Sequence, residues 1–151
     1  MRMAWLDELH LSFNPISSLP ETIGGITSLQ VLYGDHMQLS TLPASIGNLR
    51  GARELYLNDN SITSLPGTIG NLASIERLYL NNNALTTLPA TIGKLKMLTH
   101  LDLSNNKFAS FPETLGKLTS IKWLHFPYPH ILRIFPDSEM AQLAIRHGIS
   151  L

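Results

Sequence analysis

One pattern constrains this chain more than any other: the same short motif returns every 23 residues. The dipeptide Leu-Pro stands at 19–20, 42–43, 65–66 and 88–89, and Phe-Pro follows at 111–112. Ile-Gly stands at 23–24, 46–47, 69–70 and 92–93, with Leu-Gly at 115–116. The sixth dipeptide of the series, Phe-Pro at 135–136, comes one residue late. Self-similarity of this period is typical of proteins built from stacked units, none of which can bury its apolar face alone.

Each of these glycines leads into the frame L-x-x-L-x-L-x-x-N-x-L, which defines six units that start near residues 6, 29, 52, 75, 98 and 121. The fourth unit fits the frame with Ile75, Leu78, Leu80, Asn83 and Leu85. The second unit departs from it, because Gly34 replaces a core leucine and Met37 replaces the asparagine. Gly34 would permit a bulge, which could shape a pocket or loop; we favour the alternative, simple decay of one repeat, because glycine in a strand is locally weakening.

The x-Leu-x-Leu-x segment of each unit alternates with period two, which is the period of a β-strand. Its leucines therefore point inward, and the residues between them point outward. Equivalent strands of successive units are expected to pair in parallel. The asparagines that follow, Asn60, Asn83 and Asn106, are expected to form a ladder that satisfies backbone groups of adjacent loops. Proline of the Leu-Pro step starts the return arm.

These motifs resemble the leucine-rich-repeat family, in particular its 23-residue LPxxIGxLxxLxxLxLxxN class, over roughly residues 6–135. That class occurs in Ras-suppressor-like proteins, plant intracellular Ras-group proteins and bacterial effectors. The resemblance implies an α/β solenoid: a right-handed leucine-rich-repeat horseshoe segment with a parallel sheet on its concave face. Short helical or 3-10 turns would cover the convex face. With a length of 151 residues, we expect a single leucine-rich-repeat domain over 1–151.

The two ends of the solenoid carry different expectations. Residues 136–151 contain an amphipathic pattern that predicts a capping helix over the last unit. Only five residues precede Leu6, too few for such a helix, so the first strand is expected to be open unless Trp5 folds over it. An open first strand predicts self-association, or a chain that was once longer.

The outward strand positions fall into columns, and aromatic residues and histidines gather there. Tyrosine, tryptophan and arginine are common at interface hot spots, so we interpret these columns as a recognition face. The alternative is a ring ladder that only strengthens the sheet. The predicted partner-binding residues are Tyr33, Tyr56, Tyr79, Arg77, His100, Asp102, Trp123, His125 and Tyr128.

Catalysis and cofactors find little support in the sequence. His100, Asp102, Ser104 and His125 fall on neighbouring strands, so an Asp–His contact is feasible. An open, hydrated sheet, however, offers nothing that would shift pKa values or form an oxyanion hole. We therefore predict no catalytic residue, no cofactor and no metal, and the chain has no cysteine. Eleven basic and eleven acidic side chains give no net field to attract nucleic acid or a membrane surface.

Together these observations predict a non-enzymatic protein–protein interaction module that binds a partner protein through its concave face. Resemblance to bacterial effectors suggests a regulator or inhibitor of another protein. One alternative is a recognition segment related to a larger catalytic protein, such as a bacterial leucine-rich-repeat ubiquitin ligase; another is a self-associating repeat protein. The start of the chain lacks the apolar run of a signal peptide, because Asp7 and Glu8 interrupt it. We expect a cytoplasmic protein, or one translocated into a host cell if it is an effector.

Overall fold

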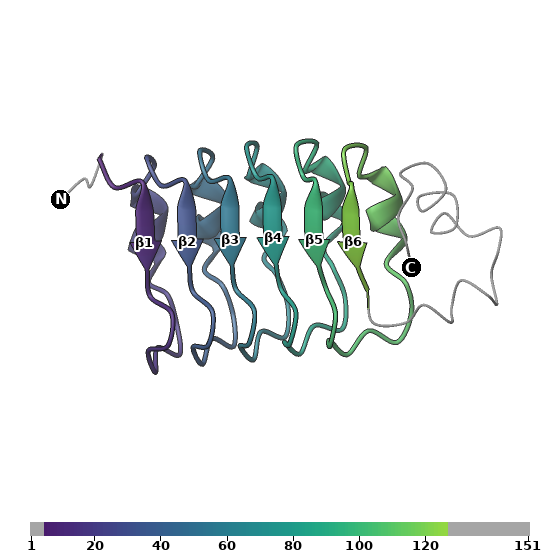
Figure 1. Cartoon of the computed structure of the whole chain (residues 1–151), viewed down its shortest axis with the longest axis horizontal. Helices are drawn as coiled ribbons and strands as arrows, with labels where there is room; N and C mark the ends of the chain where they lie inside the picture. The colour runs from purple at the N-terminus through teal and green to yellow at the C-terminus, as the bar shows by residue number, and fades with distance from the viewer. Residues whose placement is uncertain (1–4, 127–151) are drawn as a thin grey trace.

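The computed structural model describes residues 5–126, which form a solenoid of six strands and five 3-10 helices (Figure 1). The strands are β1 (Glu8–His10), β2 (Val31–Tyr33), β3 (Glu54–Tyr56), β4 (Arg77–Tyr79), β5 (His100–Asp102) and β6 (Trp123–His125). The 3-10 helices are η1 (Glu21–Gly25), η2 (Ala44–Asn48), η3 (Gly67–Asn71), η4 (Ala90–Lys94) and η5 (Glu113–Lys117). The predicted solenoid is confirmed, and the convex turns are 3-10 helices.

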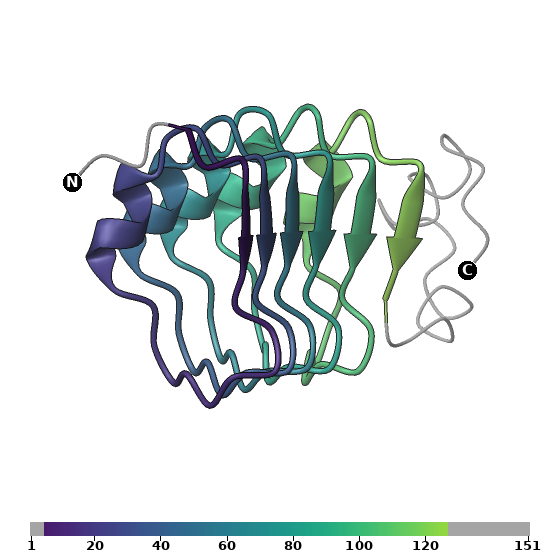
Figure 2. The same cartoon turned by 60° about the vertical axis from the view of Figure 1, so that its left-hand side comes forward.

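The six strands form one parallel sheet in the order β1-β2-β3-β4-β5-β6. Every pairing joins residues 23 positions apart, for example Leu55 with Leu78 and Tyr56 with Tyr79. The sheet lies on one side of the solenoid and the 3-10 helices lie on the other (Figure 2). We call the outer side of the sheet the concave face. This register makes equivalent residues of successive units into neighbours, so the predicted columns exist.

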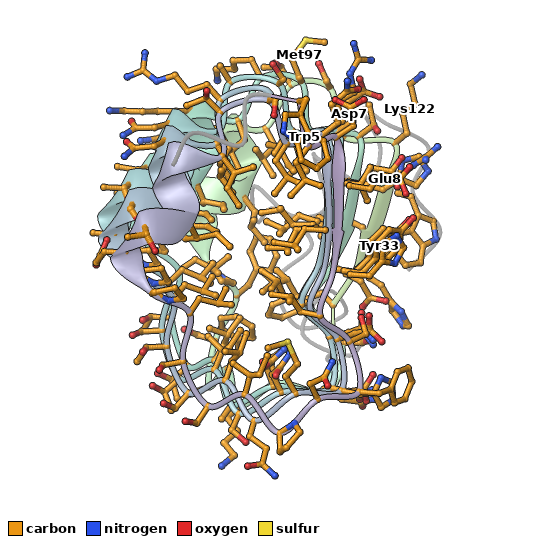
Figure 3. The ribbon with its side chains drawn as sticks, turned by 90° about the vertical axis from the view of Figure 1, so that its left-hand side faces the viewer. Trp5, Asp7, Glu8, Tyr33, Met97 and Lys122 are labelled. Atoms are coloured by element: carbon orange, nitrogen blue, oxygen red, sulfur yellow. The ribbon has the colours of Figure 1, made fainter. Side chains whose placement is uncertain are left out.

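The leucines of the frame fill the space between the sheet and the helices. From Leu29 to Phe108 most of them are fully buried, as in Leu55, Leu78 and Leu101. Leu9 and Leu11 of the first unit are only half-buried, and Trp5 is 75% exposed, so Trp5 does not cover this end. Figure 3 shows Trp5 at the start of the solenoid, with Glu8 and Tyr33 on the concave face. The predicted capping helix over 136–151 lies outside the described residues.

The predicted asparagine ladder is confirmed. Asn83 is 8% exposed; its Nδ2 donates to the carbonyl oxygens of Leu57 (2.9 Å) and Leu80 (3.1 Å). Its Oδ1 accepts a hydrogen bond from the Ile62 N–H at 2.9 Å. Asn60 and Asn106 make equivalent bonds to the units before them. Each asparagine therefore connects its own turn to the preceding unit and satisfies buried backbone groups that no strand reaches.

Gly34 does not form the bulge that a glycine at this position would permit. The Gly34 N–H donates to the backbone carbonyl oxygen of Tyr56 at 2.8 Å, so the hydrogen bonds between the second and third units continue without interruption. A Cβ on Gly34 would lie 3.3 Å from Leu57 Cδ2 and 3.6 Å from the sulfur of Met37, and both of these side chains are buried. Methionine is flexible enough to fill irregular gaps, so Met37 and Leu57 together fill the space beside Gly34. Both departures of the second unit thus compensate each other within the core.

Candidate protein-binding face

Four aromatic rings form a continuous stack along the concave face. The centroid of His10 lies 4.3 Å from that of Tyr33; Tyr33 to Tyr56 and Tyr56 to Tyr79 are each 4.9 Å. Their planes differ by 10° to 14°. The parallel register places these rings side by side because each occupies the same position of its strand. The predicted alignment of Tyr33, Tyr56 and Tyr79 is confirmed, and the structure adds His10 to the stack.

Arg77 and Glu54 hold the middle of this face in place. Arg77 Nη1 donates to Glu54 Oε1 at 2.8 Å, between β4 and β3. The Tyr56 hydroxyl donates to the other oxygen of Glu54 at 2.6 Å. This hydrogen bond, together with partial burial and the negative charge of Glu54, raises the pKa of the Tyr56 phenol well above its ordinary value. Tyr56 therefore stays protonated and remains a hydrogen-bond donor throughout the physiological pH range.

The remaining predicted residues gather on β5 and β6. The His100 ring stacks on Trp123 with centroids 6.3 Å apart, and Trp123 is 41% exposed. His125 Nδ1 lies 3.6 Å from Asp102 Oδ1, as the sequence made feasible. The Ser104 hydroxyl donates to the same Asp102 oxygen at 2.6 Å. A hydrolytic triad requires the imidazole to receive the serine proton, and in this arrangement the carboxylate accepts it. Tyr128 lies outside the described residues.

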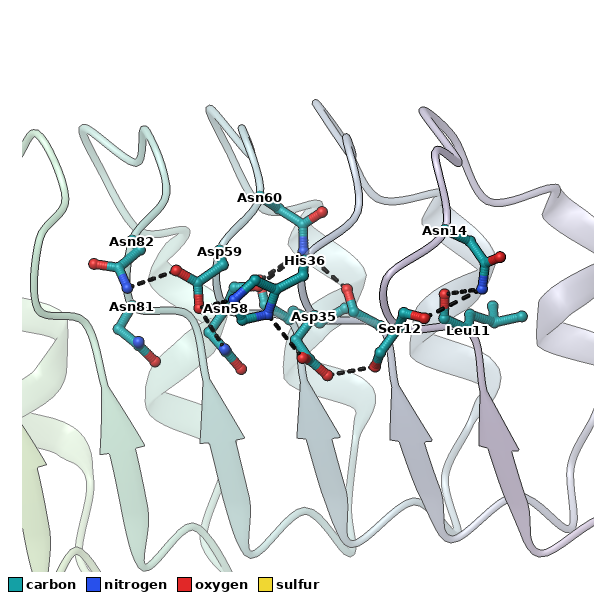
Figure 4. A network of polar contacts seen from close by, with 12 residues as sticks. Leu11, Ser12, Asn14, Asp35, His36, Asn58, Asp59, Asn60, Asn81 and Asn82 are labelled. Atoms are coloured by element: carbon teal, nitrogen blue, oxygen red, sulfur yellow. Dashed lines mark hydrogen bonds and ion pairs between the residues drawn. The ribbon is translucent and has the colours of Figure 1, made fainter.

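A polar network follows the strands, at turn positions that the sequence analysis did not include among the site residues. Five of these turn residues have a positive φ between 52° and 60°, namely Phe13, His36, Asp59, Asn82 and Asn105. Asn82 donates to Asp59 at 2.8 Å (Figure 4). Asn105 donates in turn to Asn82 at 2.8 Å. Asparagine and aspartate tolerate this backbone region. Their recurrence at one position of the repeat was the signal that could have identified the network.

Phe13 and His36 occupy the same turn position as these polar residues; histidine tolerates the left-handed region, whereas phenylalanine rarely adopts it. The Phe13 ring stacks on His36 with centroids 4.4 Å apart, although Phe13 itself is 74% exposed. His36 lies between two carboxylates, with Nδ1 3.0 Å from Asp35 and Nε2 3.6 Å from Asp59. His36 therefore joins the Phe13–His36 ring pair to the polar network at the N-terminal end of the concave face.

The Asp35 carboxylate predicts a dependence of stability on pH. Partial burial pushes its pKa upward, but hydrogen bonds from Ser12 and His36 outweigh burial, and the pKa is lowered overall. Asp35 therefore stabilises the fold above its unfolded pKa of about 3.9, and this contribution is lost as the pH falls through the folded pKa. We expect Ser12→Ala to raise the pKa of Asp35, measured by carboxyl-carbon NMR. Ser17→Ala, away from this carboxylate, should leave it unchanged; an equal shift in both variants would contradict the assignment.

Between residues 5 and 126, no group of three or more histidine and acidic side chains is arranged to hold a metal ion. No helix within the same residues is long and apolar enough to cross a membrane.

Comparison with protein families identifies the repeat. Family models described as leucine rich repeat match residues 50–108 and 77–131, and another matches residues 5–26. The chain therefore belongs to the leucine-rich-repeat family. Domains of this family typically act as non-enzymatic scaffolds that bind other proteins. No curated protein matches the chain in sequence.

Several solved structures share the fold. A leucine-rich-repeat protein of Leptospira interrogans is 33% identical, with a TM-score of 0.80 over 97% of this chain and 37% of that one. The plant peptide hormone receptor RGFR1, solved in complex with RGF2, is 31% identical, with a TM-score of 0.74 over 83% of this chain and 21% of the receptor. The leucine-rich repeat domain of the type III effector XopL is 25% identical, with a TM-score of 0.74 over 80% of this chain and 44% of that domain. This chain thus spans less than half the length of each.

Proposed function

We propose that this chain is a non-enzymatic interaction module of the 23-residue repeat class that binds a partner protein through its concave face. The observation that carries the proposal is the stack of His10, Tyr33, Tyr56 and Tyr79, which stands on the outward side of a sheet. Aromatic rings give a large contact area and lose little conformational entropy on binding. Arg77, His100, Asp102, Trp123, His125 and Tyr128 extend the proposed surface toward the C-terminal units.

The alternative role for the rings, sheet stabilisation alone, predicts a different outcome under mutation. Stacked pairs contribute about 0.5–1.5 kcal/mol each beyond their burial. Replacing Tyr56 and Tyr79 with alanine together removes two of these pairs, and the leucine core beneath them stays intact. We therefore expect a folded double variant, somewhat less stable, that no longer binds.

The experiment is affinity capture with the full chain, followed by calorimetry on the captured partner. We expect binding by the wild-type chain and loss of binding by Tyr56→Ala/Tyr79→Ala. A matched control is Thr86→Ala/Thr87→Ala, since both threonines are exposed and follow the strand on the return arm. Retained affinity in the folded tyrosine double variant would refute the concave face as the binding surface.

Similarity to the type III effector domain supports a more specific role as a bacterial effector-type regulator or inhibitor. A cytoplasmic place of action, in the producing cell or in a host, is part of this proposal, and cell fractionation tests it.

A second candidate role is that of a recognition segment within a larger catalytic protein. It is favoured by the fraction of the related chains that this sequence spans, which is 37% in the Leptospira protein. A longer transcript that continues the reading frame would support it. Self-association through β1 is the third candidate, and a constant molar mass in light scattering over a range of concentrations would exclude it.

A further inference from the structure

Charge is distributed unevenly along the concave face. The outward positions of β1, β2, β3 and their turns carry four carboxylates and no lysine or arginine: Glu8, Asp35, Glu54 and Asp59. The equivalent positions of β4 to β6 carry one arginine, Arg77, and one carboxylate, Asp102. The balanced composition of the chain as a whole conceals this asymmetry.

Among the described residues, three of these four carboxylates have no lysine or arginine partner, so no such cation cancels their charge. Arg77 neutralises Glu54. Glu8 contacts only the His10 imidazole, at 3.3 Å, within the described residues. Asp59 accepts amide hydrogen bonds from Asn58 at 2.7 Å and from Asn82 at 2.8 Å, and its carboxylate lies 3.6 Å from His36 Nε2. Hydroxyl and amide donors orient a carboxylate without removing its field, which extends over about 8–10 Å at physiological salt.

The aromatic stack runs between these carboxylates. Glu8 and Glu54 precede the stacked ring of their strand by two residues, whereas Asp35 and Asp59 follow the rings of theirs. Because the rings face one another at 10° to 14°, their edges, not their faces, are turned toward solvent. Arginine and lysine pack their aliphatic stems on such apolar surfaces and place the cationic head in a polar environment. A strip of ring edges with carboxylates on both sides fits that shape and charge.

We propose that the strip of His10, Tyr33 and Tyr56 binds an arginine- or lysine-rich segment of the partner, with the cationic heads directed at the flanking carboxylates. This inference rests on the proposed function and specifies the chemistry of the partner over β1 to β3. Arginine suits the strip best, since its guanidinium can engage a carboxylate with two parallel hydrogen bonds.

The test is an NMR titration of the ¹⁵N-labelled full chain with a capped hexapeptide of alternating arginine and glycine. The comparison peptide has glutamate in place of arginine. We expect the arginine peptide to shift the backbone amides of β1 to β3, with an effect that weakens as salt is added. Equal shifts from the glutamate peptide, or no shifts at β1 to β3, would overturn the proposal.

Single substitutions then test which carboxylates bind the arginine peptide. Glu8→Gln should weaken the arginine peptide about two- to five-fold, the range expected for one exposed ion pair. Glu54→Gln should weaken it more, because it also leaves Arg77 without its partner. Glu113→Gln, on exposed η5 of the convex side, removes the same charge and should change nothing. If Glu113→Gln weakened binding of the arginine peptide equally, the peptide would respond only to the net charge of the protein, and the assignment to this strip would be overturned.

Failure of this inference is distinguishable from failure of the proposed function. If Tyr56→Ala/Tyr79→Ala loses its captured partner while the arginine peptide leaves β1 to β3 unchanged, the basic-segment inference is wrong and concave-face binding stands. If the double variant keeps its partner, concave-face binding is wrong whatever the peptide does.

Discussion

Asn83→Ala is expected to lower the free energy of unfolding by about 1–3 kcal/mol, the largest effect of any single polar substitution that we predict. The Ile62 N–H loses its acceptor, Asn83 Oδ1 at 2.9 Å, in a buried setting. The carbonyl of Leu57 keeps a hydrogen bond from Asn60, and that of Leu80 keeps one from Asn106. The orphaned amide of Ile62 therefore dominates the cost, which chemical denaturation would measure.

Two further variants separate the parts of this effect. Asn14→Ala removes only hydrogen bonds to the carbonyls of Leu11 and Ser12 at the exposed first unit, so we expect a loss of about 1 kcal/mol or less. Asn83→Asp keeps an acceptor for Ile62 but places a second oxygen against the carbonyls, so it should also destabilise strongly. Equal losses in Asn14→Ala and Asn83→Ala would show that the ladder is not a buried network.

Gly70→Ala is expected to cost about 2–3 kcal/mol, while Gly67→Ala in the same 3-10 helix is expected to be neutral or stabilising by up to about 1 kcal/mol. A Cβ at position 70 would lie 2.5 Å from the Thr91 carbonyl oxygen and 2.7 Å from the Thr91 Cβ. At position 67 it would meet nothing within 4 Å. Neither backbone is left-handed, so the contrast isolates the close approach of η3 to the next unit.

The two variants can be compared by their midpoints of chemical denaturation, provided that the unfolding free energy depends equally steeply on denaturant concentration in both. Because both residues lie within η3 (Gly67–Asn71), helix propensity contributes nearly equally to the two changes. A result in which Gly67→Ala destabilises as much as Gly70→Ala would contradict the packing explanation. It would indicate that the flexibility of glycine, and not the approach of the Thr91 backbone, matters in this helix.

Much of this architecture was predictable because one register governs it. Leu55, Leu78 and Leu101 lie inward and Tyr33, Tyr56 and Tyr79 lie outward for the same reason, the period-two alternation of a strand repeated every 23 residues. Asn83 could be assigned a ladder role because any buried turn must satisfy its backbone polar groups. Where a residue has the same surroundings in every unit, a prediction made for one unit holds for the others.

What could not be predicted depends on side chains that differ between units. Whether Gly34 forms a bulge could not be decided from the sequence, because it depends on how the side chains of Leu57 and Met37 pack beside it, and a pattern of residue types does not give the direction of a flexible thioether. The Tyr56–Glu54 hydrogen bond likewise depends on rotamers. Phe13 and His36 break the Asn/Asp preference of their turn, so their stacking was visible only in three dimensions.

The strand order β1-β2-β3-β4-β5-β6 has a consequence for how such a surface changes in length. No strand of the described sheet closes back on a distant one, so each unit depends only on its immediate neighbours. Duplicating one interior stretch of 23 residues would lengthen the sheet by about 4.8 Å and add one place to every column without disturbing the others. A repeat surface of this design can be lengthened or shortened by recombination, one unit at a time.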